Sequence, residues 1–375
     1  MPKNARQNQS AAEVTLLTFL SESWLNWLLL FVPLSIVVEV FGLPKLWLFA
    51  VSAIAIIPLA GLLGEATEQF ACRVGPGVGG LLTAAFGNAT ELIISLFALR
   101  AGLLEVVKAS ISGSIIGNVL LVLGLSMLFG GWGREKQIFS RTHAGASAAM
   151  LFLAVVALVM PALFDLAVFG TLARRGPTIE DLSLLVAVVL IIIYLASLVF
   201  SLKTHRELLT SVPPEPVPAR LSLPNSLLLL LVTTAVVAAE AEMLVSSISE
   251  ATAALGMTEF FVGVIVVAIV GNAAEQFSAV LMAMRNNMDL AVTIATGAGT
   301  QIALFVAPVL VFASLLFGQH LSLVFNVFEI TGVALSVFAV SIVTLDGESN
   351  WFEGLQLVAV YLVLAIVFYF VPVAP

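Results

Sequence analysis

The sequence predicts an all-α polytopic membrane protein with 11 transmembrane helices. Of its 375 residues, 61% are hydrophobic and only 10% are charged, a composition that excludes ordinary soluble proteins. Apolar stretches about 20 residues long, enough to cross a bilayer, recur along the chain, and one short polar motif appears twice inside them. The net charge of -8 and the lack of a basic surface pattern predict that nucleic acid is not a partner.

The expected spans follow a polar N-terminal segment that lacks the features of a signal peptide. We place them at residues 24–43, 46–71, 77–100, 104–130, 143–164, 180–202, 224–254, 259–284, 288–317, 323–345 and 351–373. Four parts of the chain result: the N-terminal segment with the first span (1–43), a first repeat (44–202), a Pro-rich linker (203–223) and a second, inverted repeat (224–375).

Loop charges orient the expected helices. Of the 15 Lys and Arg residues, ten fall on the cytoplasmic side if the N-terminus is cytoplasmic, and five fall opposite. This places the linker in the cytoplasm and the C-terminus outside. The linker contains four prolines between Pro213 and Pro218, a composition that resists helix formation and suits an exposed connection.

A Gly-Asn-Ala-x-Glu motif occupies residues 87–91 and returns at 271–275, each time within an expected span. Its amide and carboxylate are three residues apart, so both project from one helix face. A charge at the bilayer centre costs about 2.5–3.5 kcal/mol even on the mildest scale. The alternative is a protonated structural glutamate at a helix contact. We interpret four residues as the two halves of one cation site: Glu91, Glu275, Asn88 and Asn272.

The two copies belong to a longer repeat, because shifting the chain by 184 positions aligns the third and fourth expected spans with the eighth and ninth. Five spans separate equivalent positions, and an odd number means that the second copy enters the membrane from the opposite face. This is the inverted repeat of secondary transporters, with the site near the midplane. Helix breaks that expose carbonyls are expected at four glycines: Gly87, Gly271, Gly113 and Gly297.

Carboxylates with amide and backbone carbonyls form the oxygen set that Ca²⁺ favours, and the motifs bring no thiol or imidazole for softer metals. Polar residues of the fourth and ninth spans either lie near this site or only join helices: Ser112, Ser114, Asn118, Thr296, Thr300 and Gln301. Acids of the second and seventh spans either line an access path or are interfacial: Glu65, Glu68, Glu240, Glu242 and Glu250. Glu39 and Glu329 are interpreted as interfacial or packing residues.

These residues resemble the Ca²⁺/H⁺ antiporter (CAX) family of the Ca²⁺/cation antiporter superfamily. The likeness covers nearly the whole chain, and its stretches are 58–68, 87–99, 112–118 and 271–280. The resemblance implies one leading helix and two inverted five-helix repeats, which agrees with the span count. It implies that Glu91 and Glu275 ligate Ca²⁺ and that Asn88 and Asn272 complete the centre. It also implies that Ser114 and Gln301 lie close to it, and that the second and seventh helices gate access.

Two departures from the family accompany the resemblance. Family members often carry His after the second motif glutamate, where this chain has Gln276, which leaves open the proton role and the ion preference of that position. The acidic stretch of vacuolar members is replaced by the Pro-rich linker, which favours a prokaryotic cytoplasmic membrane.

The expected function is Ca²⁺/H⁺ antiport by alternating access, because Ca²⁺ and protons would compete for the same two buried carboxylates. Ca²⁺ is then the transported substrate; no cofactor and no enzyme activity are expected, and the partners are Ca²⁺, H⁺ and lipid. A Na⁺-coupled exchanger of the same fold and, more remotely, a cation channel are the alternatives. Stoichiometry, Ca²⁺ versus Mn²⁺ preference and homo-oligomer formation stay open.

Overall fold

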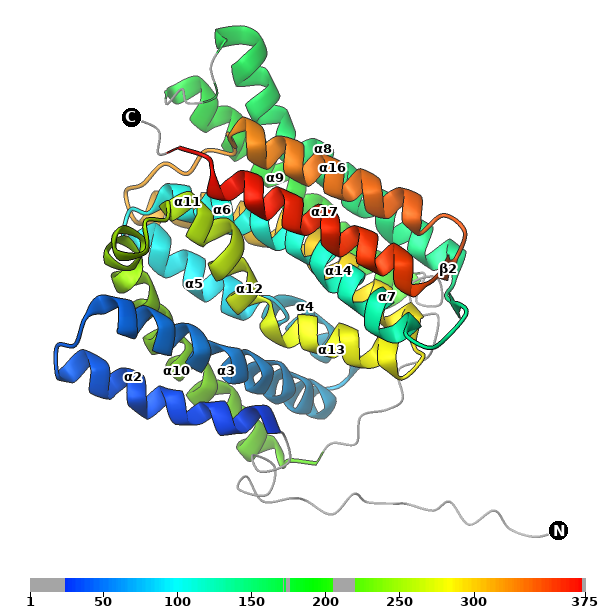
Figure 1. Cartoon of the computed structure of the whole chain (residues 1–375), viewed down its shortest axis with the longest axis horizontal. Coiled ribbons are helices and arrows are strands. Elements are labelled where there is room, and N and C mark those ends of the chain that lie inside the picture. The colour runs from blue at the N-terminus through cyan, green and yellow to red at the C-terminus, as the bar shows by residue number, and fades with distance from the viewer. Residues whose placement is uncertain (1–23, 171, 173–175, 205–219, 373–375) are drawn as a thin grey trace.

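The computed structural model describes residues 24–170, 172, 176–204 and 220–372, and it is mostly helical. The N-terminal segment before residue 24 and the prolines of the linker lie outside the described residues. Figure 1 shows α2 and α3 along one flank of the helical body and α8 and α16 along the opposite flank, with the short helices α5, α12 and α13 between them.

The first half of the chain contains a 3₁₀ helix, η1, and two π-helical segments, η2 and η3, among its α-helices. Its elements are η1 (Trp24–Leu30), α2 (Phe31–Val40), α3 (Lys45–Val74), α4 (Pro76–Phe86), α5 (Ala89–Arg100), α6 (Leu104–Ile116), η2 (Gly117–Val122), α7 (Leu123–Gly131), β1 (Gln137–Ile138), α8 (Arg141–Phe169), α9 (Pro177–Val199) and η3 (Phe200–Thr204).

The second half repeats much of this order, with π-helical segments at η4 and η5. Its elements are α10 (Leu223–Leu255), α11 (Glu259–Phe261), η4 (Val262–Val267), α12 (Ala268–Gly271), α13 (Ala273–Met284), α14 (Met288–Gln301), η5 (Ile302–Val306), α15 (Ala307–Leu316), α16 (Val327–Val343), β2 (Glu348–Ser349) and α17 (Trp351–Tyr369). The strands β1 and β2 pair antiparallel and join two loops at one end of the bundle.

Seven helices in the described part are long and apolar enough to cross a membrane, or up to nine if each of two bent helix pairs is one span. Each of these nine overlaps an expected span. The two remaining expected spans, 24–43 and 323–345, contain the shorter apolar helices Leu25–Val40 and Val327–Val343. The structure therefore supports an integral membrane protein, while the count of eleven spans stays a prediction.

The two bent pairs contain the repeated motif. Val78–Phe86 and Ala89–Arg100 meet at 49°, and Glu259–Gly271 and Ala273–Met284 meet at 59°. Each bend falls at a Gly-Asn pair, where the asparagine leaves helical geometry with φ near -105° at Asn88 and -92° at Asn272. The bends lie where the sequence predicts breaks at Gly87 and Gly271.

The breaks expected at Gly113 and Gly297 are not found, and this prediction was wrong. Gly113 lies inside α6 and Gly297 inside α14, and each helix continues into a π-helical segment, η2 or η5. A Cβ on Gly113 would collide with the backbone of Val264, so this glycine lets α6 and η4 pack closely. A Cβ on Gly297 would meet nothing within 4 Å.

Burial separates the helices that hold the site from those that face lipid. In the span Leu104–Gly131, formed by α6, η2 and α7, 83% of the most apolar window is buried, against 22% in the spans Pro177–Lys203 and Trp351–Tyr369. Helix α3 packs along α10, and the carbonyl oxygen of Leu221 accepts a hydrogen bond of 2.8 Å from Arg73 Nε. The chain thus has a central core and a flanking α3–α10 pair.

The difference between Gly113 and Gly297 gives a stability test. We expect Gly113→Ala to lower stability by about 1–3 kcal/mol, because overpacking forces backbone shifts. We expect Gly297→Ala to be neutral or to stabilise by up to about 1 kcal/mol, because alanine favours a helix interior. Thermal unfolding of the two purified variants in detergent checks this. Equal effects at both positions would contradict the packing role of Gly113.

Candidate cation site

The site begins with two asparagines that start helices without capping them. Asparagine is a preferred N-cap because its side-chain oxygen can accept from the first free N–H groups of the helix. Asn88 precedes α5 and Asn272 precedes α13, yet neither side chain makes a capping hydrogen bond. Both are buried, with 0% and 1% of their surface exposed. Their amides are therefore available for partners elsewhere in the bundle.

Each asparagine side chain bonds to a residue of the other half of the chain. Asn88 Nδ2 donates to Gln301 Oε1 at 2.5 Å, at the end of α14. Asn272 Nδ2 donates to Ser114 Oγ at 2.8 Å, and Asn272 Oδ1 accepts from Asn118 Nδ2 at 2.7 Å. Residues 88 and 301 are 213 apart in sequence, so these bonds join the two halves at the helix breaks.

The two motif glutamates lie in the first turns of α5 and α13, where the helix dipole favours a negative charge. Glu91 is 7% exposed, and Glu275 is half-buried with its Oε2 atom enclosed. The charge of Glu275 acts on Glu91, so the carboxylates are electrostatic neighbours. A Cβ on Gly271 would stand 2.9 Å from Glu91 Cγ, which shows that the second motif leaves room for the first glutamate.

Four enclosed oxygens in this cluster have no hydrogen-bond partner: Asn88 Oδ1, Glu91 Oε1, Asn118 Oδ1 and Glu275 Oε2. A buried polar atom without a partner costs roughly 1–3 kcal/mol, so each of these oxygens would gain from a bound cation. All four are hard oxygen donors of the kind that Ca²⁺ binds. Among the described residues no group of three or more His, Cys, Asp or Glu could hold a metal, so amides must supplement the two acids.

The accessory residues divide into two sets. Ser114, Asn118 and Gln301 contact the motif asparagines directly. Ser112 instead lies 3.0 Å from Glu329 Oε1, and that glutamate closes a capping box at the start of α16. The remaining threonines donate to carbonyls of their own helix at 2.7 Å: Thr296 to Val292 and Thr300 to Thr296. Hydrogen bonds thus link the first set to the motif asparagines, and a role for the other three residues at the centre stays a prediction.

Tyr194 of α9 is a contributor that sequence reasoning did not single out. Its hydroxyl donates to the carbonyl oxygen of Ala84 at 2.9 Å, in the last turn before the first helix break. A lone tyrosine in an apolar span gives no pattern, so only the fold reveals this contact. The bond satisfies a main-chain oxygen that the break has freed.

The sequence profile of the sodium/calcium exchanger protein family matches residues 44–203 and 225–370. The chain belongs to this family. The family resemblance inferred from the motifs is thereby confirmed. The two matched segments lie on either side of the Pro-rich linker, and together they contain both Gly-Asn-Ala-x-Glu motifs.

Relatives within this group are similar over almost their whole length. A Ca²⁺/H⁺ antiporter of Aphanothece halophytica is 46% identical over 364 residues, covering 93% of this chain and 96% of that protein. The Ca²⁺/H⁺ antiporter ChaA of Bacillus subtilis is 42% identical, covering 90% and 96%. The solved structure of native YfkE superposes with a TM-score of 0.80 at 39% identity, covering 92% of this chain and 100% of that one.

The acids expected along an access path do not form one group. Glu65 and Glu68 on α3 and Glu242 and Glu250 on α10 are exposed along this flanking helix pair. Glu240 differs, because it is 1% exposed and its Oε1 accepts from Ser35 Oγ of the leading helix α2 at 2.6 Å. Glu240 therefore packs between α2 and α10, and its expected access role stays a prediction.

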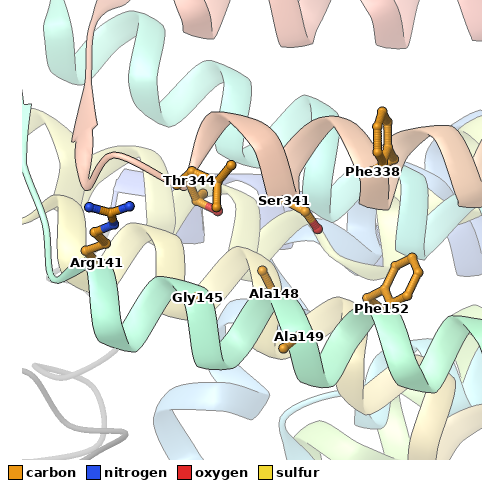
Figure 2. Close-up of a pocket in the computed structure, with 9 residues that line it drawn as sticks. Arg141, Gly145, Ala148, Ala149, Phe152, Phe338, Ser341 and Thr344 are labelled. Carbon is orange, nitrogen blue, oxygen red and sulfur yellow. The ribbon is translucent and has the colours of Figure 1, made fainter.

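A groove of about 430 Å³ lies away from the acids, between α8 and α16. Figure 2 shows Arg141 and Thr344 toward one end and Phe152 and Phe338 toward the other end. Its lining contains no carboxylate, so it does not belong to the cation site.

The packing role of Glu240 predicts a mild effect of its neutral analogue. Glu240→Gln keeps an acceptor for Ser35 and removes a buried acid, so thermal stability should be unchanged or higher. The Ca²⁺ transport rate should stay within about twofold of wild type. Flux and thermal unfolding of the purified variant check this, with Glu240→Leu as the control that loses the acceptor and should unfold earlier. A stable Glu240→Gln protein without transport would restore a direct role in the ion path.

Proposed function

We propose that this membrane protein exchanges Ca²⁺ for H⁺ through one centre formed by Glu91 and Glu275. The observation that carries the proposal is a set of four enclosed, unpartnered oxygens, three on the repeated motifs and one on Asn118, which bonds to the second motif. Two of them belong to carboxylates and two to amides, and they come from both halves of the chain. Each of the four can accept a bond from a divalent cation.

The exchange follows from charge. Two neighbouring buried carboxylates cannot both stay ionised and unpaired, because each charge loses its hydration and repels the other. Either Ca²⁺ or protons must neutralise them, so one ion displaces the other. Each pH unit across the membrane supplies about 1.4 kcal/mol per proton to drive this displacement. Antiport then requires only that the centre open to one side at a time.

The comparisons support protons as the coupling ion. The relatives at 42–46% identity are named Ca²⁺/H⁺ antiporters, and their similarity spans both motifs. The centre also contains two acids, with no group of three or more ligating acids in the described part. A Na⁺-coupled exchanger needs more charged ligands at one centre, so it remains the second candidate.

The finer architecture belongs to the same proposal. We infer eleven helices, a leading one followed by two inverted repeats of five, with the N-terminus in the cytoplasm, the C-terminus outside, and a bacterial cytoplasmic membrane as the location. The flanking helices α3 and α10 are the gating pair. In support, α3 packs on α12 and α13 of the second motif, and α10 packs on α5 of the first motif. Movement of the pair would therefore reach both acids.

Neutral variants of the two acids test the shared centre. Glu91→Gln and Glu275→Gln keep size and most hydrogen bonding but remove the charge that binds Ca²⁺ and the proton. We expect Ca²⁺ flux in proteoliposomes with an imposed pH gradient to fall to the level of protein-free liposomes. Thermal stability should stay at or above that of wild type, because a costly buried acid is neutralised.

Three results would contradict this proposal. A folded Glu91→Gln protein that exchanges Ca²⁺ at the wild-type rate would exclude the shared carboxylate. Wild-type flux that follows a Na⁺ gradient and ignores a pH gradient would favour the sodium-coupled candidate. Loss of both folding and flux in each variant would instead point to structural glutamates.

The orientation has its own test. A cysteine placed between Pro213 and Pro218, with the exposed Cys72 replaced by serine, should react with an impermeant thiol reagent only from the cytoplasmic side. Inside-out and right-side-out vesicles give the two measurements. Reaction from the outside only would reverse the orientation and leave the repeat unchanged.

A further inference from the structure

The carbonyl four residues before each motif asparagine has different hydrogen-bond donors in the two halves of the chain. Ala84 and Ala268 are equivalent, since they are 184 positions apart and each stands four residues before its motif asparagine. The carbonyl oxygen of Ala268 accepts from Asn272 itself, from its main-chain N–H at 3.2 Å and from its Nδ2 at 2.9 Å. The carbonyl oxygen of Ala84 accepts from the hydroxyl of Tyr194 at 2.9 Å.

This difference determines which amide atoms of each asparagine remain available to bind a cation. Asn272 has both ends of its amide occupied, with Nδ2 on Ala268 and Ser114 and Oδ1 on Asn118. The Ala268 carbonyl can only accept, so it fixes which end of the amide carries the nitrogen. Asn88 uses Nδ2 for Gln301 alone, and its Oδ1 has no partner. Only the first asparagine therefore keeps a free oxygen.

We propose that Tyr194 is a positioning residue that makes the cation site asymmetric. By holding the Ala84 carbonyl, Tyr194 leaves Asn88 free to turn away from its own helix and offer Oδ1 to the cation. Asn272 holds its helix break and orients Asn118, whose Oδ1 takes the corresponding place. This inference rests on the proposed function, because it assigns ligands for the transported ion.

The packing around Tyr194 holds its hydroxyl at the Ala84 carbonyl. It is 6% exposed, and its ring stacks on Phe305 of η5 with the centroids 4.9 Å apart and an interplanar angle of 24°. Phe305 follows Gln301, the partner of Asn88, by one turn. The stacking of Tyr194 on Phe305 thus lies close to both partners of the first break. It holds the Tyr194 hydroxyl, which donates to the Ala84 carbonyl, and Phe305 lies one turn from Gln301, which accepts from Asn88 Nδ2.

Removal of the hydroxyl has a defined consequence. Without it, the freed Ala84 carbonyl needs a new donor, and Asn88 Nδ2 stands four residues further along the chain, as Asn272 does from Ala268. Asn88 would then turn its amide toward its own helix and donate one N–H to the Ala84 carbonyl, as Asn272 does to Ala268 while its other N–H stays on Ser114. Its oxygen would leave the cation, while both glutamates would stay in place.

The test is Tyr194→Phe, which keeps the ring and its stacking. We expect the apparent KM for Ca²⁺ to rise about tenfold, the equivalent of 1.4 kcal/mol, while the maximal flux at saturating Ca²⁺ stays near wild type. Tyr361→Phe is the matched control, because the Tyr361 hydroxyl is buried at 5% exposure without a partner. It should leave the KM unchanged. The readouts are flux in proteoliposomes and Ca²⁺ titration of the purified full chain.

A second pair of variants keeps the test valid if Tyr194→Phe does not fold. Asn88→Ala should raise the KM for Ca²⁺ with little change in thermal stability, whereas Asn272→Ala should lower thermal stability. Combining Asn88→Ala with Tyr194→Phe should add little to either single effect on KM, because both remove the same oxygen.

The outcomes separate this inference from the proposed function. Wild-type KM in stable Tyr194→Phe, or equal effects of the two asparagine variants, overturns the asymmetry while Ca²⁺/H⁺ exchange by wild type stands. A wild-type protein that neither binds Ca²⁺ nor exchanges it overturns both.

Discussion

The structure depends on one constraint: a helix broken inside a membrane must find partners for its freed backbone groups within the protein, since lipid offers none. The two breaks meet this need in different ways. Tyr194 of α9 supplies a donor at the first break, and Asn272 supplies its own at the second. The amides left over bond to residues of the opposite half. Polar satisfaction therefore forces the two halves to interlock where the acids stand.

Close approach of the halves has a steric requirement as well. Gly271 leaves room for Glu91, Gly113 lets α6 meet the backbone of Val264, and a Cβ on Gly263 would stand 2.8 Å from that of Ala109. Small residues at helix contacts are the usual way in which membrane helices gain packing energy. The glycines thus have two separate roles: Gly87 and Gly271 stand at helix breaks, and Gly113 allows close contact between helices. The roles differ because of the residues packed around each glycine.

The two roles of glycine show which features of the structure the sequence could predict. Span positions and the two bends could be predicted, because apolar length and a polar motif within an apolar run are local signals. The role of Gly113 could not, since it depends on Val264, a residue 151 positions away. For the same reason the burial of Glu240 against Ser35 and the contact of Tyr194 with Ala84 leave no trace in a single sequence. The composition shows which polar groups would be costly to bury in a membrane. Only the fold shows which hydrogen-bond partner lowers the cost for each of them.

Charge balance connects the site to the choice of coupling ion. Glu91 and Glu275 together carry two negative charges when ionised, and both one Ca²⁺ and two protons return the centre to neutrality. A buried centre that is neutral in both loaded states avoids the solvation penalty of a net charge while it is closed to water. A single Na⁺ would leave one of the two carboxylates uncompensated, so a sodium exchanger with the same two acids would have to hold two Na⁺ in the centre. Two acids framed by amide oxygens therefore suit an exchange in which one doubly charged ion takes the place of two protons.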